Sequence, residues 1–435
     1  MAAETDLSLR SQVIYQIFTR NYREGTFQAV RNDLERIKHL GADIIYLLPI
    51  QPSGEKNRKG SMGSPYAIKD YRAVDPVQGS REDFIELCDA VHAAGMKIII
   101  DVVYNHTSPD SVLAKTHPEW FYHRPDGSFG NRVGDWWDVI DLSYDDPSFW
   151  RYQIETLKEW AAYVDGFRCD VAPMIPLEFW KAAKAEVETV RPGCLWIAES
   201  VDPQFIRINR MSGIHCHSDS ELYQVFDICY DYDVYGTMAD AAAGRGTLKQ
   251  YLDRVNLQEE IYPENYIKLR CLENHDRTRA AALFPDRKVL RNWTAWNYFQ
   301  KGIVMLYAGQ EAAAAHHPTL FDHDPVNFET GTDLTPFLHR LKEIKQDPIF
   351  TYSSFFAQPV GVNQEVISAS LIGNRGTQAE GRKAVGIFST SGRAQLLPTE
   401  LKDGTYTDAI SGKTVDVFEG FLAYDGEPLI LLNAQ

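Results

Sequence analysis

Features that direct a chain to a membrane or to nucleic acid are missing from these 435 residues. No uninterrupted apolar run approaches the roughly 20 residues of a membrane-spanning helix, and the opening MAAETDLSLRSQ has no basic segment followed by an apolar core. Lys and Arg number only 44 against 60 Asp and Glu, a formal net charge of −16. Such a charge repels phosphate backbones and anionic lipids, so we expect a neutral ligand and neither a nucleic-acid nor a membrane partner.

The spacing of the cysteines indicates neither a metal site nor a disulfide framework, because none of the six cysteines forms a CxxC pair. Several fall in strand-like runs, where a free thiol packs as a small hydrophobe. We therefore expect reduced thiols and a cytoplasmic protein. The cluster HCHSD, residues 215–219, has His side chains but no second ligand group, so we interpret it as a surface loop.

What the chain does contain is a regular alternation of short apolar runs and amphipathic segments. Eight runs have the composition of buried strands: VIYQIF (13–18), ADIIYLLPI (42–50), MKIIIDVVYNH (96–106), VDGFRCDV (164–171), CLWIAES (194–200), YQVFDICYD (223–231), YIKLRCLENHD (266–276) and GIVMLYAG (302–309). Segments 27–40, 81–95, 147–163, 176–190 and 289–300 place apolar residues at helical intervals between them. Eight such units predict an α/β fold, a (β/α)8 TIM barrel.

Two stretches depart from this alternation. Residues 107–146 are rich in Pro, Gly, His and Trp without a helical period, so we predict a small domain inserted after the third strand. After residue 348, short strand-like runs such as VISASLIG and KAVGIFST alternate with Gly-containing turns and predict a C-terminal antiparallel β-sandwich. We expect the barrel over residues 1–106 and 147–347, the inserted domain over 107–146 and the sandwich over 348–435.

Charged side chains gather where the predicted barrel strands end. Arg168 and Asp170 lie two residues apart, so they share one face of their strand. Other strand ends carry Asp101 and His106 in DVVYNH, Glu199 in IAES, and Asn274, His275 and Asp276 in ENHD. In a TIM barrel these ends line the active site. One such pair alone is readily explained as a structural ion pair. Burying so many charged side chains, however, has a desolvation penalty that the stability of a barrel does not explain.

These four segments, in this order, resemble the four signature regions of the α-amylase family of retaining glycoside hydrolases. GSPYAIKDY resembles the family loop that carries a sugar-stacking Tyr, here Tyr66. DVIDLSYDDP is similar to a motif that ends the family's inserted domain, and LYAGQE to its eighth strand. The resemblance covers nearly the whole chain and implies the same barrel, inserted domain and C-terminal sandwich.

The resemblance implies a glycosidase that cleaves mainly α-1,4 bonds in maltooligosaccharides, starch and related α-glucans by double displacement. It assigns Asp170 as nucleophile, Glu199 as general acid/base and Asp276 as the third carboxylate. Retaining hydrolysis needs one ionised carboxylate and one protonated carboxyl about 5–5.5 Å apart, and we expect the neighbouring arginine to lower the pKa of the nucleophile. The substrate contacts that the resemblance implies are Tyr66, Asp101, His106, Arg168, His275 and Arg279.

The segment after the predicted nucleophile departs from the family pattern. Typical α-amylases have a Lys-His pair there that contacts sugar and calcium, whereas this chain has Pro173 and Met174. Asn105 and Asp141 match calcium positions of the family, yet two oxygen donors fall short of the six to eight that calcium takes. We therefore expect no required cofactor and no metal site, with calcium left open. Val171 also follows the nucleophile in α-1,6-specific glucosidases, so that activity stays an alternative.

The same three carboxylates also suit enzymes that use an acceptor other than water. A glucanotransferase or a phosphorolytic enzyme would employ them in this way, and a non-catalytic carbohydrate-binding protein is disfavoured because this chain keeps all three. The aromatic residues of the inserted segment either line a narrowed cleft or form their own core; they are Trp120, Phe121, Tyr122, Trp136 and Trp137. The sequence does not indicate chain-length preference, endo or exo action, or oligomeric state.

Overall fold

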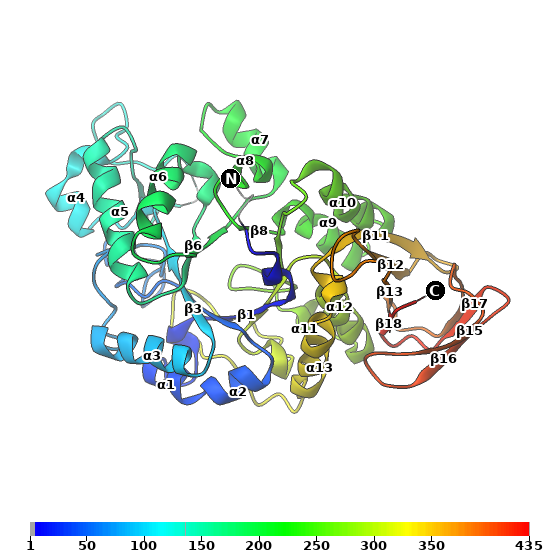
Figure 1. Ribbon diagram of the computed structural model, residues 1–435. Helices are drawn as coiled ribbons and strands as arrows, with labels where there is room; N and C mark the ends of the chain where they lie inside the picture. Colours follow the sequence, from blue (N-terminus) through cyan, green and yellow to red (C-terminus); the bar gives the residue numbers. More distant parts are fainter. Residues whose placement is uncertain (1–4, 135, 435) are drawn as a thin grey trace.

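The computed structural model describes residues 5–134 and 136–434 (Figure 1). Eight parallel strands close into a barrel in the order β1-β10-β9-β8-β7-β6-β3-β2, which confirms the predicted TIM barrel. The strands are β1 (Val13–Ile17), β2 (Ile44–Leu47), β3 (Lys97–Val102), β6 (Gly166–Cys169), β7 (Leu195–Ala198), β8 (Ile228–Tyr230), β9 (Lys268–Arg270) and β10 (Ile303–Tyr307). Each lies within one of the eight predicted runs, because a barrel strand is buried on both faces and is therefore mostly apolar; β9 is the exception, with the buried charges of Lys268 and Arg270.

Helices cover the outside of the barrel. They are α1 (Phe27–Asn32), α2 (Leu34–His39), α3 (Arg81–Ala93), α5 (Pro147–Ala161), α6 (Leu177–Glu188), α7 (Pro203–Met211), α8 (Asp219–Leu222), α9 (Tyr232–Ala242), α10 (Leu248–Ile261), α11 (Ala280–Leu283), α12 (Arg287–Phe299) and α13 (Thr335–Lys345). Four of the five predicted helical segments form a single helix each. The expectation of one helix over 27–40 is wrong, since the chain bends at Asp33, whose amide donates to the Val30 carbonyl and whose carboxylate accepts from Arg36.

Residues 107–146 leave the barrel between β3 and α5. Strand β4 (His106–Thr107) pairs antiparallel with β5 (Ile140–Asp141), and α4 (Val112–Thr116) lies between them in sequence. Trp120 and Phe121 are buried in this segment. Trp120 packs against Phe149 and Tyr152 of α5, and both Trp120 and Phe121 belong to the core that continues into the barrel, so these two rings do not form a separate core of the segment.

Two four-stranded antiparallel sheets form the C-terminal part and confirm the predicted β-rich fold there. The first sheet has the order β11-β12-β13-β18 and the second β14-β17-β16-β15. Their bounds are β11 (Ser353–Val360), β12 (Val366–Gly373), β13 (Lys383–Ser389), β14 (Gln395–Pro398), β15 (Gly404–Thr407), β16 (Thr414–Phe418), β17 (Phe421–Tyr424) and β18 (Leu429–Leu432). Figure 1 shows the second sheet at the end of the molecule farthest from the barrel.

The first of these sheets is apolar on both faces. Ile367 and Phe388 belong to the core that continues into the barrel, and the ring of Phe388 lies 5.7 Å from that of Trp296 in α12. Val366 and Ile387, each adjacent in sequence to one of them, belong to the separate core between the two sheets. The period of two along each strand thus places the first sheet as a layer between the barrel helices and the second sheet.

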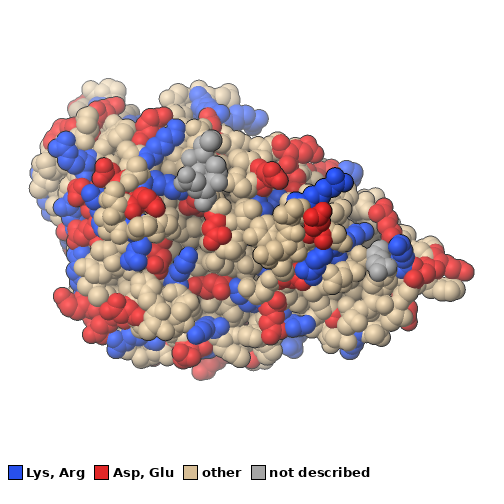
Figure 2. All heavy atoms as spheres, in the orientation of Figure 1, with Lys and Arg blue, Asp and Glu red and all other residues tan. Residues whose placement is uncertain are grey.

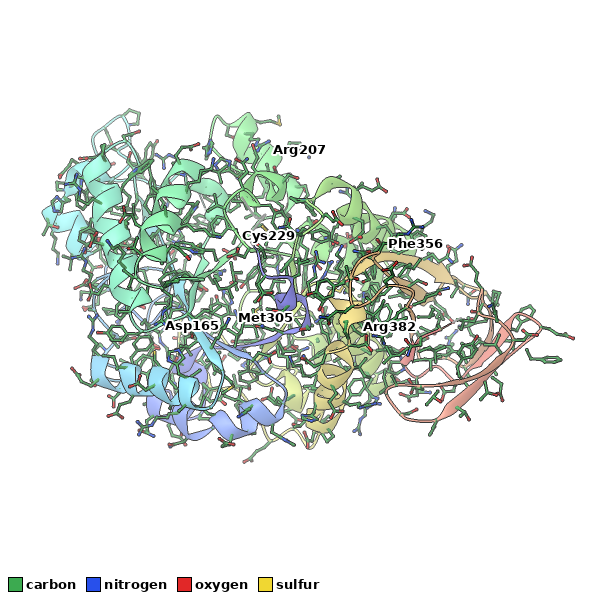
Figure 3. The ribbon with its side chains drawn as sticks, in the orientation of Figure 1. Asp165, Arg207, Cys229, Met305, Phe356 and Arg382 are labelled. Atoms are coloured by element: carbon green, nitrogen blue, oxygen red, sulfur yellow. The ribbon has the colours of Figure 1, made fainter. Side chains whose placement is uncertain are left out.

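The positions of the charged side chains and of the cysteines can now be compared with the expectations from the sequence. Figure 2 shows acidic and basic side chains interspersed over one face of the molecule. All six cysteines are buried free thiols, and Cys229 lies in the barrel together with Met305 (Figure 3). Within residues 5–134 and 136–434, no helix is long and apolar enough to cross a bilayer. The cluster at 215–219 is irregular until Asp219, which begins α8.

Candidate active site

The predicted carboxylates meet at the C-terminal ends of the barrel strands. Asp170 follows β6, Glu199 follows β7, and Asp276 lies in the loop after β9. All three line one pocket of about 310 Å³. Its other lining residues are Lys59, Ser64, Tyr66, His106, Trp136, Asp138, Val139, Val171, Leu320 and Phe321.

Arg168 lies behind this pocket and contacts three carboxylates, two of which line the pocket. Its Nη1 donates to Asp101 Oδ1 and to Asp170 Oδ1, both at 2.8 Å, and its Nη2 lies 2.7 Å from Glu199 Oε1. The guanidinium is completely buried. The β3–β6 register sets part of this arrangement, because it places Asp101 directly beside Arg168. One cation cannot neutralise three carboxylates, so the cluster either keeps a net negative charge or retains a proton.

Burial dominates the ionisation of Asp170. It raises the pKa of this carboxyl well above the ordinary value, the charge of Glu199 raises it further, and Arg168 lowers it only in part. The expectation that the arginine gives Asp170 a low pKa is therefore wrong. Among the described residues, the buried Oδ2 of Asp170 has no hydrogen-bond partner, and His106 Nε2 lies 3.8 Å from it. This oxygen therefore keeps an acceptor position that no described protein group uses.

Glu199 is positioned by the turn that follows β6. Its Oε2 accepts a hydrogen bond of 2.9 Å from the backbone N–H of Val171. Val171 has a φ of 42°, in the left-handed region that a β-branched residue rarely adopts. Such a conformation costs roughly 1–3 kcal/mol and clusters at functional sites. The strained turn thus brings the Val171 amide to the Glu199 carboxyl.

Asp276 is the most exposed of the three carboxylates, with 42 % of its side chain accessible. His275 Nε2 lies 3.0 Å from its Oδ2. Although burial acts to raise it, the pKa of Asp276 is lowered to about 2, chiefly by His275 and then by Arg168 and Arg277. Asp276 is therefore ionised at neutral pH and faces the pocket as a hydrogen-bond acceptor.

Tyr66 and His106 line the pocket, and His275 is buried beside Tyr66. Gln16 Nε2 lies 3.0 Å from His275 Nδ1, which leaves the Nε2 of this histidine, 2.6 Å from Tyr66 Oη, to carry the proton. Tyr66 in turn donates to Asp101 Oδ2 at 3.0 Å. Burial lowers the pKa of His106 to about 4, so this imidazole is neutral at pH 7. These groups form a fixed set of donors and acceptors around the carboxylates.

Four of the six predicted substrate contacts do not line the pocket, namely Asp101, Arg168, His275 and Arg279. Asp101 and Arg168 are buried behind it and act on the other carboxylates. The predicted sugar contact from Arg279 is not supported by its position, because this side chain is fully buried and lies 2.6 Å from Glu273. Its remaining nitrogens donate to the carbonyls of His316 and Ala308.

One wall of the pocket was predicted only in part. Lys59 Nζ lies 2.7 Å from Asp138 Oδ1, and Phe321 and Trp136 stand in the same wall. The ring of Trp136 lies 5.2 Å from that of His106 and lines the pocket, as the interpretation of a narrowed cleft predicts, whereas Trp120 and Phe121 are buried. These residues come from loops without a recognisable motif, and the only signal was the aromatic content of 107–146.

The two residues that match the family's calcium position, Asn105 and Asp141, already contact other groups, although Oδ1 of Asp141 has no partner among the described residues. Asp141 Oδ2 accepts from the backbone N–H of Arg132 at 2.7 Å, and the Arg132 guanidinium lies 3.5 Å from the same oxygen. Asn105 Nδ2 lies 3.2 Å from His106 Nδ1. A cation is thus already beside the carboxylate, and calcium takes six to eight oxygen ligands. In the part of the chain that the structure describes, no group of three or more His, Cys, Asp or Glu could hold a metal ion.

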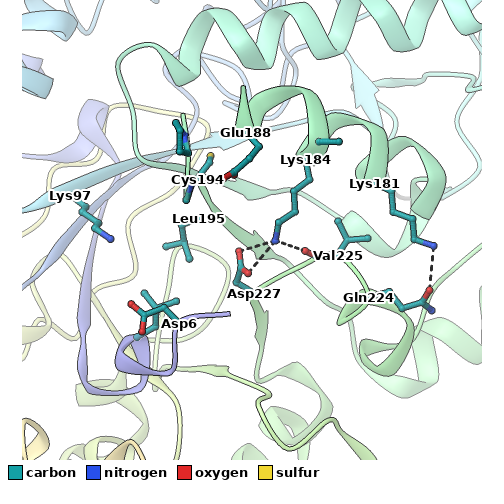
Figure 4. A pocket seen from close by; sticks show the side chains of 14 residues that line it. Asp6, Lys97, Lys181, Lys184, Glu188, Cys194, Leu195, Gln224, Val225 and Asp227 are labelled. Carbon is teal, nitrogen blue, oxygen red and sulfur yellow. Dashed lines mark hydrogen bonds and ion pairs between the residues drawn. The ribbon is translucent and has the colours of Figure 1, made fainter. Parts of the chain in front are cut away.

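A larger hollow of about 710 Å³ lies at the opposite end of the barrel, beside the first residues of β3 and β7 (Figure 4). Its Lys184 Nζ lies 3.1 Å from Asp227 Oδ1 and donates to the Val225 carbonyl. In TIM barrels this N-terminal face contributes stability, whereas the chemistry takes place at the C-terminal face. The pocket around Asp170 is therefore the candidate site.

Comparisons with known proteins identify the family of the chain. The model of the family described as "Alpha amylase, catalytic domain" matches residues 12–352, and that of the "Bacterial Alpha amylase C-terminal domain" matches residues 376–431. The structure is similar to that of an alpha-amylase from Lactobacillus plantarum, with a TM-score of 0.94, 44% identity and coverage of 98% of this chain and 100% of the other. A noncanonic maltogenic alpha-amylase, AmyB from Thermotoga neapolitana, gives a TM-score of 0.86 and 30% identity at the same coverage.

Curated sequences give a similar result over shorter regions. Alpha-amylase MalA from Haloarcula japonica is 27% identical over 320 residues, which are 69% of this chain and 44% of MalA. An alpha-1,4-glucan:maltose-1-phosphate maltosyltransferase from Arcanobacterium haemolyticum is 32% identical over 216 residues, which are 45% of this chain and 31% of the transferase. The chain thus matches less than half the length of either curated relative.

Proposed function

Since the chain belongs to the alpha-amylase family and is an enzyme that acts on α-glucans, we propose that it hydrolyses α-1,4 bonds of short maltooligosaccharides with retention of configuration. The observation that carries this proposal is the meeting of Asp170, Glu199 and Asp276 around one pocket, together with an Asp170 oxygen that has no hydrogen-bond partner among the described residues.

The proposed reaction has two steps. In the first, Oδ2 of Asp170 attacks the anomeric carbon while Glu199 gives a proton to the leaving oxygen, and a glycosyl–enzyme bond forms. In the second, Glu199 takes a proton from water, whose oxygen attacks the same carbon and releases Asp170. The negative charge left around Arg168 stabilises the positive charge that develops on the sugar in both transition states.

The same cluster explains how one carboxyl can be protonated and its neighbour ionised. Arg168 lies within 2.8 Å of both Asp170 and Glu199, so the pair can share a single proton. The first step requires the proton on Glu199 and the charge on Asp170, so Asp170, whose pKa burial raises, must be ionised before it attacks. The side chains of His106 and Asp276 bind sugar hydroxyls, His275 holds Asp276 and Tyr66 in place, and Tyr66 presents a ring face to the sugar.

We expect maltotriose to maltohexaose to be hydrolysed with a kcat/KM at least about tenfold above that for soluble starch, because a small pocket gains no binding energy from distant parts of a polymer. The products should be mainly glucose and maltose in the α configuration. A chromatographic time course, with proton NMR of the first product, measures both. Faster attack on starch with a steep early fall in iodine staining would contradict the preference, and a β product would contradict retention.

A transferase function is the second candidate, and it is favoured by the similarity to maltosyltransferases. The same three carboxylates would then pass the sugar to an acceptor other than water. Product analysis with and without added maltose or inorganic phosphate distinguishes the two, since a hydrolase yields equal product profiles in both.

We also propose that the enzyme does not need calcium. Excess EDTA should change the initial rate by less than about 20 % and Tm by less than about 2 °C, because no bound ion would be withdrawn from the folded state. The Arg132 guanidinium already lies beside Asp141. Rates and thermal melts before and after dialysis against EDTA test this. A fall in Tm that calcium restores and magnesium does not would show a calcium site.

A further inference from the structure

Lys59 joins three loops at the rim of the pocket. It belongs to the loop between β2 and α3, and its Nζ forms an ion pair of 2.7 Å with Asp138 of the inserted segment. The same ammonium lies 5.3 Å from the ring centroid of Trp137 and 5.6 Å from that of Phe321, in the loop after β10. Only 23 % of the Lys59 side chain and 4 % of the Asp138 side chain are exposed. This pair is therefore largely removed from water, unlike an ordinary surface ion pair.

The backbone next to Lys59 is fixed as well. The Met62 N–H donates to the Phe321 carbonyl at 2.9 Å, and the Ser61 N–H donates to Asp322 Oδ1 at 2.8 Å. Gly60 has a φ of +62°, and a Cβ at this position would lie 2.5 Å from the Phe321 carbonyl oxygen. The wall is thus a built contact between two loops that depends on a glycine.

The position of this wall relative to the reacting groups follows from the contacts of Asp170. His106, whose ring packs on Trp136 beside the wall, lies near Oδ2 of Asp170. Arg168, which holds Glu199, lies against Oδ1. Because the general acid protonates the leaving group, the leaving part of the substrate lies on the Glu199 side. The wall therefore stands on the other side, where the non-reducing part of a chain would extend.

We propose that Lys59 and Asp138 are specificity-determining residues that close this side of the pocket, so that the enzyme takes its substrate by a free non-reducing end. The inference rests on the proposed hydrolase function and deepens it. A chain that threads past the reacting sugar would have to separate a mostly buried ion pair and leave both charges unpaired, which is strongly unfavourable. Rings and chains with blocked ends are excluded for that reason.

The test compares substrates that differ only in their ends. The wild-type enzyme should hydrolyse maltoheptaose at least about 100-fold faster, in kcat/KM, than β-cyclodextrin, the ring of the same length. A nitrophenyl maltoheptaoside whose non-reducing end carries an ethylidene block should also resist cleavage, while the unblocked compound is cleaved. Comparable rates on free and blocked or cyclic substrates would overturn the proposal. If no α-glucan is cleaved at all, the proposed hydrolase function fails instead.

Variants then assign the effect to the ion pair. Lys59→Met keeps the apolar stem and removes the charge, and Asp138→Asn removes the partner charge; each should raise the ratio of cyclodextrin to maltoheptaose kcat/KM by about tenfold or more. The ratio is informative even if absolute rates fall. Lys69→Met is the matched control, because Lys69 forms an exposed pair with Glu55 on the same loop and away from the pocket. An unchanged ratio in folded Lys59→Met and Asp138→Asn proteins would show that the pair does not set specificity.

Discussion

Asp170→Asn is expected to lower kcat on every α-glucan by about 10⁴-fold or more, because it replaces the attacking oxygen with a group that cannot form the glycosyl–enzyme bond. The substitution is isosteric and the substrate contacts remain. Binding of maltotriose, measured by calorimetry on the variant, should therefore persist. Wild-type activity in Asp170→Asn would refute the assignment of the nucleophile.

The same substitution should leave the fold intact. Burial and the charge of Glu199 raise the folded-state pKa of Asp170 above its unfolded-state value. Protonated Asp170 therefore stabilises the folded state below the unfolded-state pKa, and this stabilisation is lost as the pH rises through the folded-state pKa. The neutral amide avoids this loss, and Tm at pH 7 should be unchanged or higher. Asp145→Asn, at an exposed position, is the control for the substitution and should keep full activity. A clear drop in Tm would indicate that lost activity reflects damage to the fold.

Glu199→Gln is expected to lower the rate on maltooligosaccharides by roughly 10²–10⁴-fold, the usual contribution of a general acid. Glucosyl fluoride and aryl glycosides with good leaving groups need little protonation, so their first step should be nearly unaffected. A burst of leaving group followed by a slow steady state, recorded by stopped flow, would show this, since Glu199 also acts as the base in the second step.

Glu273→Gln provides the matched comparison for that experiment. Glu273 is also a buried glutamate paired with an arginine, Arg279, but it does not line the pocket. Its substitution should lower Tm and affect good and poor leaving groups alike. If Glu199→Gln behaves in the same way, with equal losses on both kinds of substrate, Glu199 has a structural role and the acid is another group.

The sequence was most informative for segments whose burial in the fold can be read from their own residue pattern. Each barrel strand is buried on both faces, so its apolar run is visible without knowledge of its neighbours. The strand-end rule then brings Asp170 and Glu199 to one pocket, although 29 positions of chain separate them. What could not be predicted depends on contacts between loops. Lys59 and Asp138 are far apart in sequence and neither belongs to a periodic segment.

Electrostatics was the other limit of sequence-based reasoning. A charge two residues away suggests a low pKa for Asp170, but desolvation and a second carboxylate reverse the direction. Arg279 shows the same limit, since only the fold reveals that Glu273 and two carbonyls already occupy its guanidinium.

The two-faced sheet of the C-terminal part bears on how the protein forms during synthesis. Trp296 in α12 lies against Phe355 of β11 and Phe388 of β13, so these barrel rings have no complete cover until the later strands arrive. Strand β1 likewise pairs with β10, which follows nearly 300 positions later. A ribosome-bound chain that already contains α12 but not yet β11 therefore still exposes apolar surface around Trp296. Complete packing of the barrel is thus coupled to translation of the strands that follow it.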